Sequence, residues 1–274
     1  ASVRLTDGVL VFENTETLRF STLNFSAAFF SNSSSIAEFT LLGATVVQDN
    51  LPSITVLLKE AMRARAVEIS ATSGGDGLAA VLNLEDSAIK DMAGNDIFVA
   101  ALTLSESPDV GEPILISATV ALTTGVVTMT FNETIDMTPI TLTNFGKMFI
   151  TNDAYGGDIL IQGAKEFADD SVTISVVLTE AQRVLAIVRS ETPGGDGVAA
   201  HLHTEASACV DLAGNNNSAF DVVLIEHADT GTPFLFNATV DYNNGEIIMF
   251  FNETIMASPA SMVNTTKLVV VNAT

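Results

Sequence analysis

The chain has 274 residues, of which 47% are hydrophobic and only 16% are charged. Such a chain holds enough apolar material for a packed core, which excludes a disordered protein, and its length indicates more than one domain. The 33 acidic and 11 basic residues give a net charge of −22, which excludes nucleic acid and anionic membranes as partners and attracts cations such as Ca²⁺.

No apolar run reaches the roughly 20 residues that span a bilayer, so we expect no insertion into a membrane. The first four residues do not resemble a signal peptide, so a secreted form would be a mature chain or an internal fragment. The single cysteine, Cys209, excludes an intrachain disulfide. It aligns with Ile89 in the repeat described below, which predicts a buried, unreactive thiol.

Residues 1–109 are expected to form a first unit that is rich in short strands. Helix formers at 58–66 predict one short helix. A Ser-Gly-Gly-Asp-Gly loop at 73–77 and an Asp-Met-Ala-Gly-Asn turn at 91–95 follow it. The aspartate and the Gly-Asn pair of the second motif are typical of a tight turn with a left-handed residue.

The same pattern returns 120 residues later and therefore indicates tandem repeats. The loop at 73–77 recurs as Pro-Gly-Gly-Asp-Gly at 193–197. The turn at 91–95 recurs as Asp-Leu-Ala-Gly-Asn at 211–215. Residues 113–229 thus make up the second unit.

The second unit is expected to open with a β-hairpin. Residues 114–122 and 127–131 show the alternation of half-buried strands, and a Thr-Thr-Gly turn at 123–125 joins them. Asn132 falls in the outward phase. The residues predicted to face the core are Ile114, Ile116, Ala118, Val120, Leu122, Val127, Met129 and Phe131.

One helix interrupts the later strands of this unit. Helix formers behind a threonine at 178–186 predict a short helical crossover between two sheets. This spacing predicts an all-β fold of tandem immunoglobulin-like β-sandwich repeats, with a short helical crossover in each. The later strands are expected at 147–152, 158–164, 171–178, 198–205 and 219–226.

Residues 233–274 match the opening of the second unit and predict an incomplete third one. Phe-Asn-Glu-Thr-Ile occurs unchanged at 131–135 and 251–255. The first unit, in turn, lacks its opening segment. Two arrangements follow: the polypeptide continues, or the C-terminal strands complete a neighbouring subunit by strand addition.

Two linkers, 109–113 and 229–233, are expected to join the units. Each ends in proline. A short linker with a fixed φ limits swivel, so the linkers predict a stiff rod.

Eight asparagines carry the N-x-Ser/Thr pattern, more than the serine and threonine content would give by chance. Such sites are used on the exposed surface of secreted chains, so we expect several N-linked glycans. The side chain of Asn237 is predicted to face outward, because that of the preceding residue, Phe236, is expected to face inward. The eight sites are Asn24, Asn32, Asn132, Asn216, Asn237, Asn252, Asn264 and Asn272.

These motifs resemble bacterial Ig-like repeats of the surface-layer and adhesin type. The shared features are a hydrophobic strand before Phe-Asn-Glu-Thr, a Leu-Thr-Glu-Ala-Gln helix, a Gly-Gly-Asp-Gly loop, and Val-Asp-Leu-Ala-Gly-Asn before the last strand. The chain is also similar to giant extracellular repeat proteins of algae and other protists. The resemblance covers nearly the whole chain and implies an extracellular spacer, adhesin or filament subunit. The sequon density departs from bacterial members and indicates a eukaryotic source.

Four aspartates at turns and linkers are candidate Ca²⁺ ligands. Asp91 and Asp211 open the two Asp-x-Ala-Gly-Asn turns, and Asp109 and Asp229 lie in the linkers. Ca²⁺ takes about six to eight oxygen ligands. Each loop offers one or two, so a site would have to gather ligands at a junction, with Glu112 among them. The alternative is that each turn aspartate only caps its turn.

Other candidate chemistry is weaker. His201 and His203 share one strand face, a spacing that can bind zinc. No third ligand is placed by motif, and the first unit has Val81 and Asn83 at these positions, which favours an incidental pair. The glycine-rich loops lack the phosphate-binding pattern, and no nucleophile elbow or His-Glu-x-x-His helix occurs. We therefore expect no enzyme activity and no cofactor.

These features favour a structural subunit of an extracellular, N-glycosylated filament or cell-surface coat, whose main partner is another repeat of the same kind. The alternative is the stalk or recognition module of a large cell-surface adhesin, stiffened by Ca²⁺, with glycans or neighbouring surface proteins as partners. A secreted carbohydrate-active enzyme is a third reading. All three place the chain outside the cell.

Overall fold

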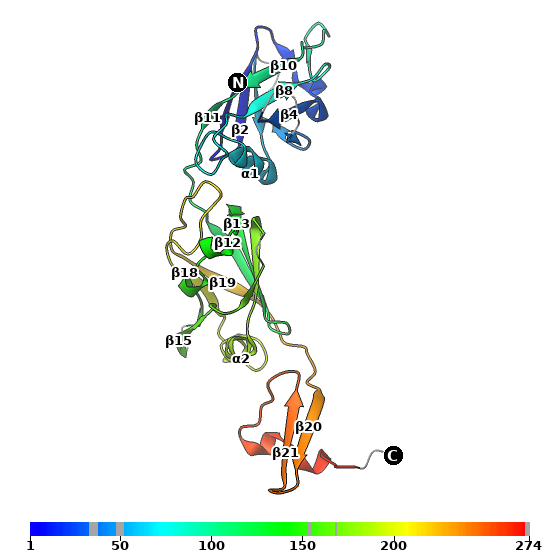
Figure 1. The fold of residues 1–274 in the computed structure, drawn as a ribbon, viewed down its shortest axis with the longest axis vertical. Helices are drawn as coiled ribbons and strands as arrows, with labels where there is room; N and C mark the ends of the chain where they lie inside the picture. The colour runs from blue at the N-terminus through cyan, green and yellow to red at the C-terminus, as the bar shows by residue number, and fades with distance from the viewer. Residues whose placement is uncertain (33–37, 48–51, 153–154, 168, 272–274) are drawn as a thin grey trace.

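The computed structural model describes residues 1–32, 38–47, 52–152, 155–167 and 169–271. Three units follow one another along its long axis, with the N-terminus in the first and the C-terminus in the third (Figure 1). We call them repeat 1 (1–109), repeat 2 (113–229) and repeat 3 (233–274).

Repeat 1 is a sandwich of two sheets, with strand orders β11-β1-β2-β7-β6 and β10-β8-β4-β5. Its first strand pairs antiparallel with the second and parallel with the last. A short β3–β9 pair lies beside the sheets. The bounds are β1 (Ser2–Arg4), β2 (Val9–Glu13), β3 (Leu18–Arg19), η1 (Phe20–Thr22), η2 (Phe25–Ala27), β4 (Ala28–Ser31), β5 (Phe39–Thr40), β6 (Thr45–Val46), β7 (Ser53–Leu57), α1 (Glu60–Glu68), β8 (Val81–Leu84), β9 (Lys90–Asp91), β10 (Ala100–Thr103) and β11 (Ser105–Ser107).

Repeat 2 has the same pairing in one continuous sheet of order β15-β14-β18-β19-β12-β13-β17-β16. Its last strand pairs with β18 on one side and, in parallel, with β12 on the other, so it joins the two layers. The bounds are β12 (Leu115–Ala121), β13 (Val126–Ile135), η3 (Ile140–Leu142), η4 (Phe145–Lys147), β14 (Met148–Asn152), β15 (Tyr155–Leu160), β16 (Lys165–Glu166), β17 (Ser171–Val177), α2 (Glu180–Val188), β18 (His201–Thr204) and β19 (Phe220–His227).

The predicted helical crossover is present in both repeats. Helix α1 connects β7 to β8, and α2 connects β17 to β18. Thr179 caps α2 by accepting from Gln182 N, while the Gln182 side chain accepts from Thr179 N at 2.8 Å. This reciprocal pair satisfies two of the free N–H groups at the helix start. The all-β sandwich predicted from the spacing is therefore confirmed, with strand ends that differ by a few residues.

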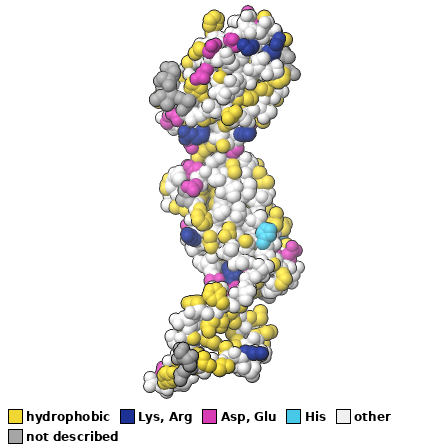
Figure 2. Space-filling model, turned by 90° about the vertical axis from the view of Figure 1, so that its right-hand side faces the viewer, with side chains coloured by type: hydrophobic (Ala, Val, Ile, Leu, Met, Phe, Trp, Pro, Cys, Tyr) yellow, Lys and Arg dark blue, Asp and Glu magenta, His cyan; other side chains and the backbone are white. Residues whose placement is uncertain are grey.

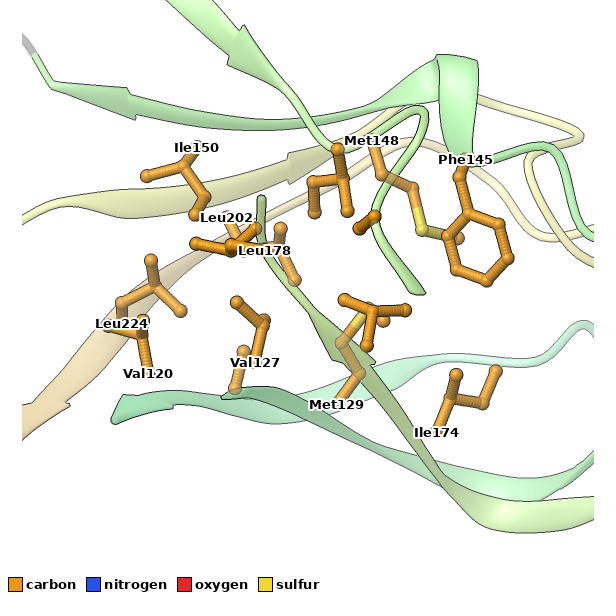
Figure 3. Close-up of a cluster of buried hydrophobic side chains, with 14 of the residues drawn as sticks. Val120, Val127, Met129, Phe145, Met148, Ile150, Ile174, Leu178, Leu202 and Leu224 are labelled. Atoms are coloured by element: carbon orange, nitrogen blue, oxygen red, sulfur yellow. The ribbon is translucent and has the colours of Figure 1, made fainter. Parts of the chain in front are cut away.

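The core of repeat 2 lies between its two layers (Figure 3). Val120, Val127 and Met129 from β12 and β13 face Ile150 and Leu202 from β14 and β18, and all five are at most 2% exposed. Every member of this core comes from residues 115–224. Repeat 2 therefore buries its apolar face without help from its neighbours, which is what an independently folding domain requires.

The inward phase predicted for the first half of β12 is wrong. Ile114 and Ile116 are 52% and 61% exposed, whereas Leu115 is buried. The register shifts between Leu115 and Ser117, so Ile116 is an extra, bulged residue that reverses the alternation. From Ala118 onward the predicted inward phase holds.

Repeat 3 consists of a hairpin and two 3-10 turns. Its hairpin has the same bulge, between Leu235 and Asn237. Phe236, predicted to face inward, is 62% exposed, and Leu235 and Val240 are 47% and 40% exposed, because the described residues of repeat 3 place no second sheet over this two-stranded one. Gly245 takes φ +73° in the turn, which a side chain would oppose. No helix among the described residues is long and apolar enough to cross a bilayer. The bounds are β20 (Leu235–Asp241), β21 (Glu246–Phe251), η5 (Ala260–Met262) and η6 (Thr265–Lys267).

Candidate functional site at the repeat junction

Helix α1 places an ion pair at the end of repeat 1 that faces repeat 2. Arg63 Nε donates to Glu60 Oε2 over 2.6 Å, one turn away on the same helix. Arg63 Nη1 also donates to the backbone oxygen of Leu5 at 3.1 Å. These bonds fix the position of the Arg63 guanidinium within repeat 1.

The same two side chains then cross the junction. Arg63 pairs with Asp109 in the linker and donates through Nη2 to Glu133 Oε2 of β13 at 3.0 Å. Glu60 Oε1 accepts from the backbone N–H and the hydroxyl of Thr134, at 2.8 and 2.9 Å. The Arg63, Asp109 and Glu133 side chains are each at most 7% exposed. Such charge-assisted bonds between buried groups hold the junction in one geometry.

The two glycine-containing motifs of the sequence also meet here. Ser73 Oγ donates to the backbone oxygen of Ala213 at 2.7 Å. Gly74 has φ +82°, and a Cβ at this position would lie 2.0 Å from the backbone oxygen of Leu212. The loop of repeat 1 therefore needs glycine to approach the turn of repeat 2.

The turn of repeat 2 is partly covered by repeat 1. Ala213 belongs to the buried core of repeat 1, and Leu212 packs against it. Asn215 Nδ2 donates to the backbone oxygen of Asp109 at 3.3 Å, and Ser218 Oγ donates to Glu112. Apolar packing and further hydrogen bonds thus accompany the charged network at this junction. Figure 2 shows charged side chains gathered at the constriction between the units.

The junction between repeats 2 and 3 repeats the charged contacts of the first one. Arg183 bonds to Glu180 and Asp229, each at 2.7 Å, to the backbone oxygen of Leu122 at 2.9 Å, and to Glu253 at 3.4 Å. Glu180 Oε1 accepts from Thr254 N at 2.8 Å. Two junctions within one chain are therefore built to one design.

Three acidic residues form the one group of His, Cys, Asp or Glu, among the described residues, that is close enough to share a metal ion. One carboxylate oxygen from each of Asp109, Glu133 and Asp211 lies within 4.8 Å of the others, and all three residues are buried. Carboxylates of this kind are ligands for Ca²⁺, which would also need backbone oxygens or water.

The electrostatics of this acidic group reflect its burial. Burial raises the pKa of Glu133 to about 7, helped by the charges of Asp109, Asp211 and Glu60 and opposed by Arg63. Burial also raises the pKa of Asp211, against the hydrogen bonds from Asn215. One arginine does not balance four acids, so the junction favours an added proton or cation.

The other proposed ligands lie elsewhere. Asp91 is at the opposite end of repeat 1, where it accepts from Asn95 N at 2.8 Å and Asn95 Nδ2 at 2.7 Å as a turn cap. Asp229 pairs with Arg183 at the second junction, and Glu112 bonds to Ser218. Glu60, Arg63 and Glu133 were not predicted from the sequence as site residues.

Signals for these missed residues were present in the repeat. The Glu-x-x-Arg spacing occurs in both helices, at 60–63 and 180–183, and Phe-Asn-Glu-Thr is unchanged between repeats 2 and 3. A charged pair that occurs at the same positions of two otherwise different helices indicates that these side chains contact a residue of another repeat.

The histidines and the cysteine take the places expected of them. His201 Nδ1 lies 3.2 Å from Asp221 Oδ2, and His203 lies against the ring of Phe149. Cys209 is buried, and burial raises the pKa of its thiol to about 12. A thiol with such a pKa stays protonated and unreactive near neutral pH.

No family model matches the chain, and no curated protein matches it. Among solved structures, it is similar to one described as Sidekick-1 immunoglobulin domains 1–4, with 9% identity and a TM-score of 0.22. The match covers 86% of this chain and 51% of that one, so the chain spans about half the length of that structure. The immunoglobulin-like assignment follows from the two-layer sandwich and its strand pairing.

Most of the sequon asparagines are accessible. Asn132 is exposed beside buried Phe131, and its Oδ1 accepts from Ile114 N at 2.6 Å. Asn32 is half-buried and donates to Asp76, and Asn272 lies outside the described residues. Glycosylation of these sites stays a prediction. The exposed sites are Asn24, Asn132, Asn216, Asn237, Asn252 and Asn264.

Proposed function

We propose that the chain is a structural subunit of an extracellular, N-glycosylated filament or cell-surface coat, built from immunoglobulin-like repeats joined end to end. The observation that supports it is the recurrence of one junction. Glu60 and Arg63 hold repeat 2 as Glu180 and Arg183 hold repeat 3.

A repeated junction favours a filament because it adds length without new chemistry. Each repeat contacts its neighbours through the same residues, so successive units take related orientations. The buried ion pairs are poor sources of net stability, because their desolvation offsets much of their attraction. Their value lies in specifying one geometry, which a stiff assembly needs and a flexible tether does not.

The surface supports the same proposal. A net charge of −22 disfavours side-to-side contact between identical subunits at low salt. Glycans on exposed asparagines such as Asn132 would add bulky polar mass to the flanks and limit lateral association. Growth would then be directed to the ends of the repeats.

Electron microscopy of the native material tests the proposal. We expect regular fibres with knobs at the spacing of one repeat. Dispersed rods tipped by another domain would contradict the filament and support the adhesin stalk. Treatment with an N-glycosidase, followed by mass measurement, checks the glycan part: a constant mass would remove the glycoprotein claim while leaving the filament intact.

A second candidate is an adhesin stalk stiffened by Ca²⁺, favoured by the buried group of Asp109, Glu133 and Asp211. Calorimetric titration of the full chain with Ca²⁺ tests it. We expect binding heat and a higher melting temperature, both lost in Asp211→Asn. The control is Asp91→Asn, which removes a turn carboxylate outside this group. Absence of heat and of any rise in melting temperature would remove the Ca²⁺ proposal.

A further inference from the structure

The end of repeat 1 that points away from repeat 2 carries the same set of residues that repeat 2 presents to repeat 1. Leu18 pairs with Asp91 there, as Ile135 pairs with Asp211 at the junction. By this register Glu16 and Thr17 occupy the places of Glu133 and Thr134. We call Glu16, Thr17, Asp91, Met92 and Asn95 the receiving face of repeat 1.

The receiving face is already folded in the geometry of the occupied one. Asn95 N donates to Asp91 Oδ1 at 2.8 Å, and Asn215 N donates to Asp211 Oδ1 at the same distance. Asn95 Nδ2 also donates to Asp91 Oδ2, as Asn215 Nδ2 donates to Asp211 Oδ2. Docking would therefore need little rearrangement of this turn, which lowers the cost of binding.

The two faces differ in their burial. Glu133 and Asp211 are buried under repeat 1, whereas Glu16 is exposed and Asp91 is half-exposed. Met92, in the place of half-buried Leu212, is 49% exposed. The side chains beside the turn surround an open hollow whose lining includes Asn14, Glu16, Leu18, Asp91, Asn95 and Phe98.

The exposed surface of this face is both acidic and apolar. Phe98 is 92% exposed, and Val99 beside it is 72% exposed. Acidic groups beside uncovered apolar side chains are typical of an interaction surface whose partner brings a cation and an apolar contact. The helix end of a repeat supplies both, since Arg63 and the Gly74 loop do so at the occupied junction.

We propose that the receiving face of repeat 1 docks the helix-and-linker end of another repeat of this kind. In this contact the arginine of a Glu-x-x-Arg helix pairs with Glu16, and the helix glutamate accepts from Thr17. The Gly-Gly loop packs on Met92. This inference rests on the proposed function and names the partner of this face.

The test uses the full chain and repeat 2 as the probe. Residues 113–232 contain a complete core of their own and lack the hairpin that covers Arg183 in the full chain. The probe carries Glu133→Arg, so that it cannot dock on itself. It is titrated to about 1 mM, the effective concentration that a short linker gives, against the isotope-labelled full chain followed by NMR.

We expect the amide signals of Thr17, Asp91 and Asn95 to shift on addition of the probe. A probe with Arg183→Ala should bind about tenfold more weakly or worse, because a buried charge partner is lost. The matched control, Lys165→Ala, removes an exposed positive charge that lies over the Phe167 ring and belongs to no Glu-x-x-Arg pair, and it should bind like the parent probe. Glu16→Gln in the full chain should weaken binding of the parent probe.

Absence of shifts up to about 1 mM, or equal shifts with the Arg183→Ala probe, would overturn the inference. Circular dichroism of each probe verifies that it is folded. Neither negative result bears on the junction between repeats 1 and 2, because the coupling between Arg63 and Glu133 is measured separately, within one chain. Failure of the docking face is therefore distinguishable from failure of the filament proposal.

Discussion

Glu60 of repeat 1 and Thr134 of repeat 2 are joined by two hydrogen bonds to one carboxylate oxygen, from the threonine backbone at 2.8 Å and from its hydroxyl at 2.9 Å. Glu60 also binds Arg63, which itself reaches Glu133. The helix of one repeat thus binds two consecutive residues of the next, Glu133 and Thr134. This contact links the sequence motif to the alignment of the repeats.

Thr134→Val removes the hydroxyl but keeps the shape of the side chain. We expect a loss of about 1.5 kcal/mol in the free energy of unfolding, the usual range for a hydrogen bond to a charged group. Urea denaturation followed by circular dichroism measures it. Thr128→Val is the control, because Thr128 bonds only within repeat 2, to Ser175 at 3.3 Å. Equal losses in the two variants would show that the junction bond contributes nothing of its own.

Gly74→Ala should destabilise the chain far more than Gly194→Ala. Both glycines have positive φ, at +82° and +97°, so both variants carry similar backbone strain. Only the Cβ at 74 would collide with repeat 2, 2.0 Å from the oxygen of Leu212, whereas the Cβ at 194 meets Ile187 at 3.3 Å. The difference in melting temperature between the two variants therefore reports the contact between repeats. No difference would mean that the loop and turn do not touch in solution.

The stability of the junction should fall as pH rises from 5 to 8. The pKa of Glu133 is raised by burial from 4.5 to about 7, so its contribution is fully present below about pH 4.5 and is lost as pH rises through 7. The loss is at most about 3 kcal/mol, since one pKa unit corresponds to about 1.4 kcal/mol. Glu180, whose pKa the hydrogen bond from Arg183 lowers to about 2, titrates below this window.

Glu133→Gln should remove the part of this pH dependence that Glu133 causes, while the raised pKa of Asp211 stays. Unfolding free energies at pH 5, 6, 7 and 8, with a chelator present, compare it with the parent chain. The exposed Glu85→Gln is the control and should keep the parent slope. A parent chain whose stability is level or rising between pH 5 and 8 would contradict the raised pKa.

Much of the fold could be predicted from the sequence because it depends on local pattern and on repetition. The alternation Val127, Met129, Phe131 defined a strand with a buried face, and the helix near Glu180 followed from its cap and composition. The bulge at Ile116 could not be found in this way. An extra residue reverses the phase of a strand without changing its composition, so Ile114 and Ile116 still resembled core residues.

The site was only half predictable for a related reason. Asp109 and Asp211 were recognised as candidate ligands because they lie in a linker and a turn. Arg63 and Glu133 were not, because a charged residue in a helix or strand usually indicates a solvent-exposed face. Their burial arises from contact between repeats, which no single repeat encodes by periodicity. Comparison of the repeats, position by position, carries that information.

A double-mutant cycle on Arg63 and Glu133 tests most directly whether the repeats are held in a fixed alignment. The free energy of unfolding in urea is measured for Arg63→Met, Glu133→Gln and the double variant at pH 8, where Glu133 is mainly ionised. A control cycle replaces Arg63→Met with Arg65→Met, because Arg65 is an exposed arginine of the same helix. We expect a coupling energy of about 1 kcal/mol or more for Arg63 with Glu133, and additivity within about 0.5 kcal/mol for the control. Additive effects in both cycles would contradict a fixed junction and leave the repeats as independent domains on a linker.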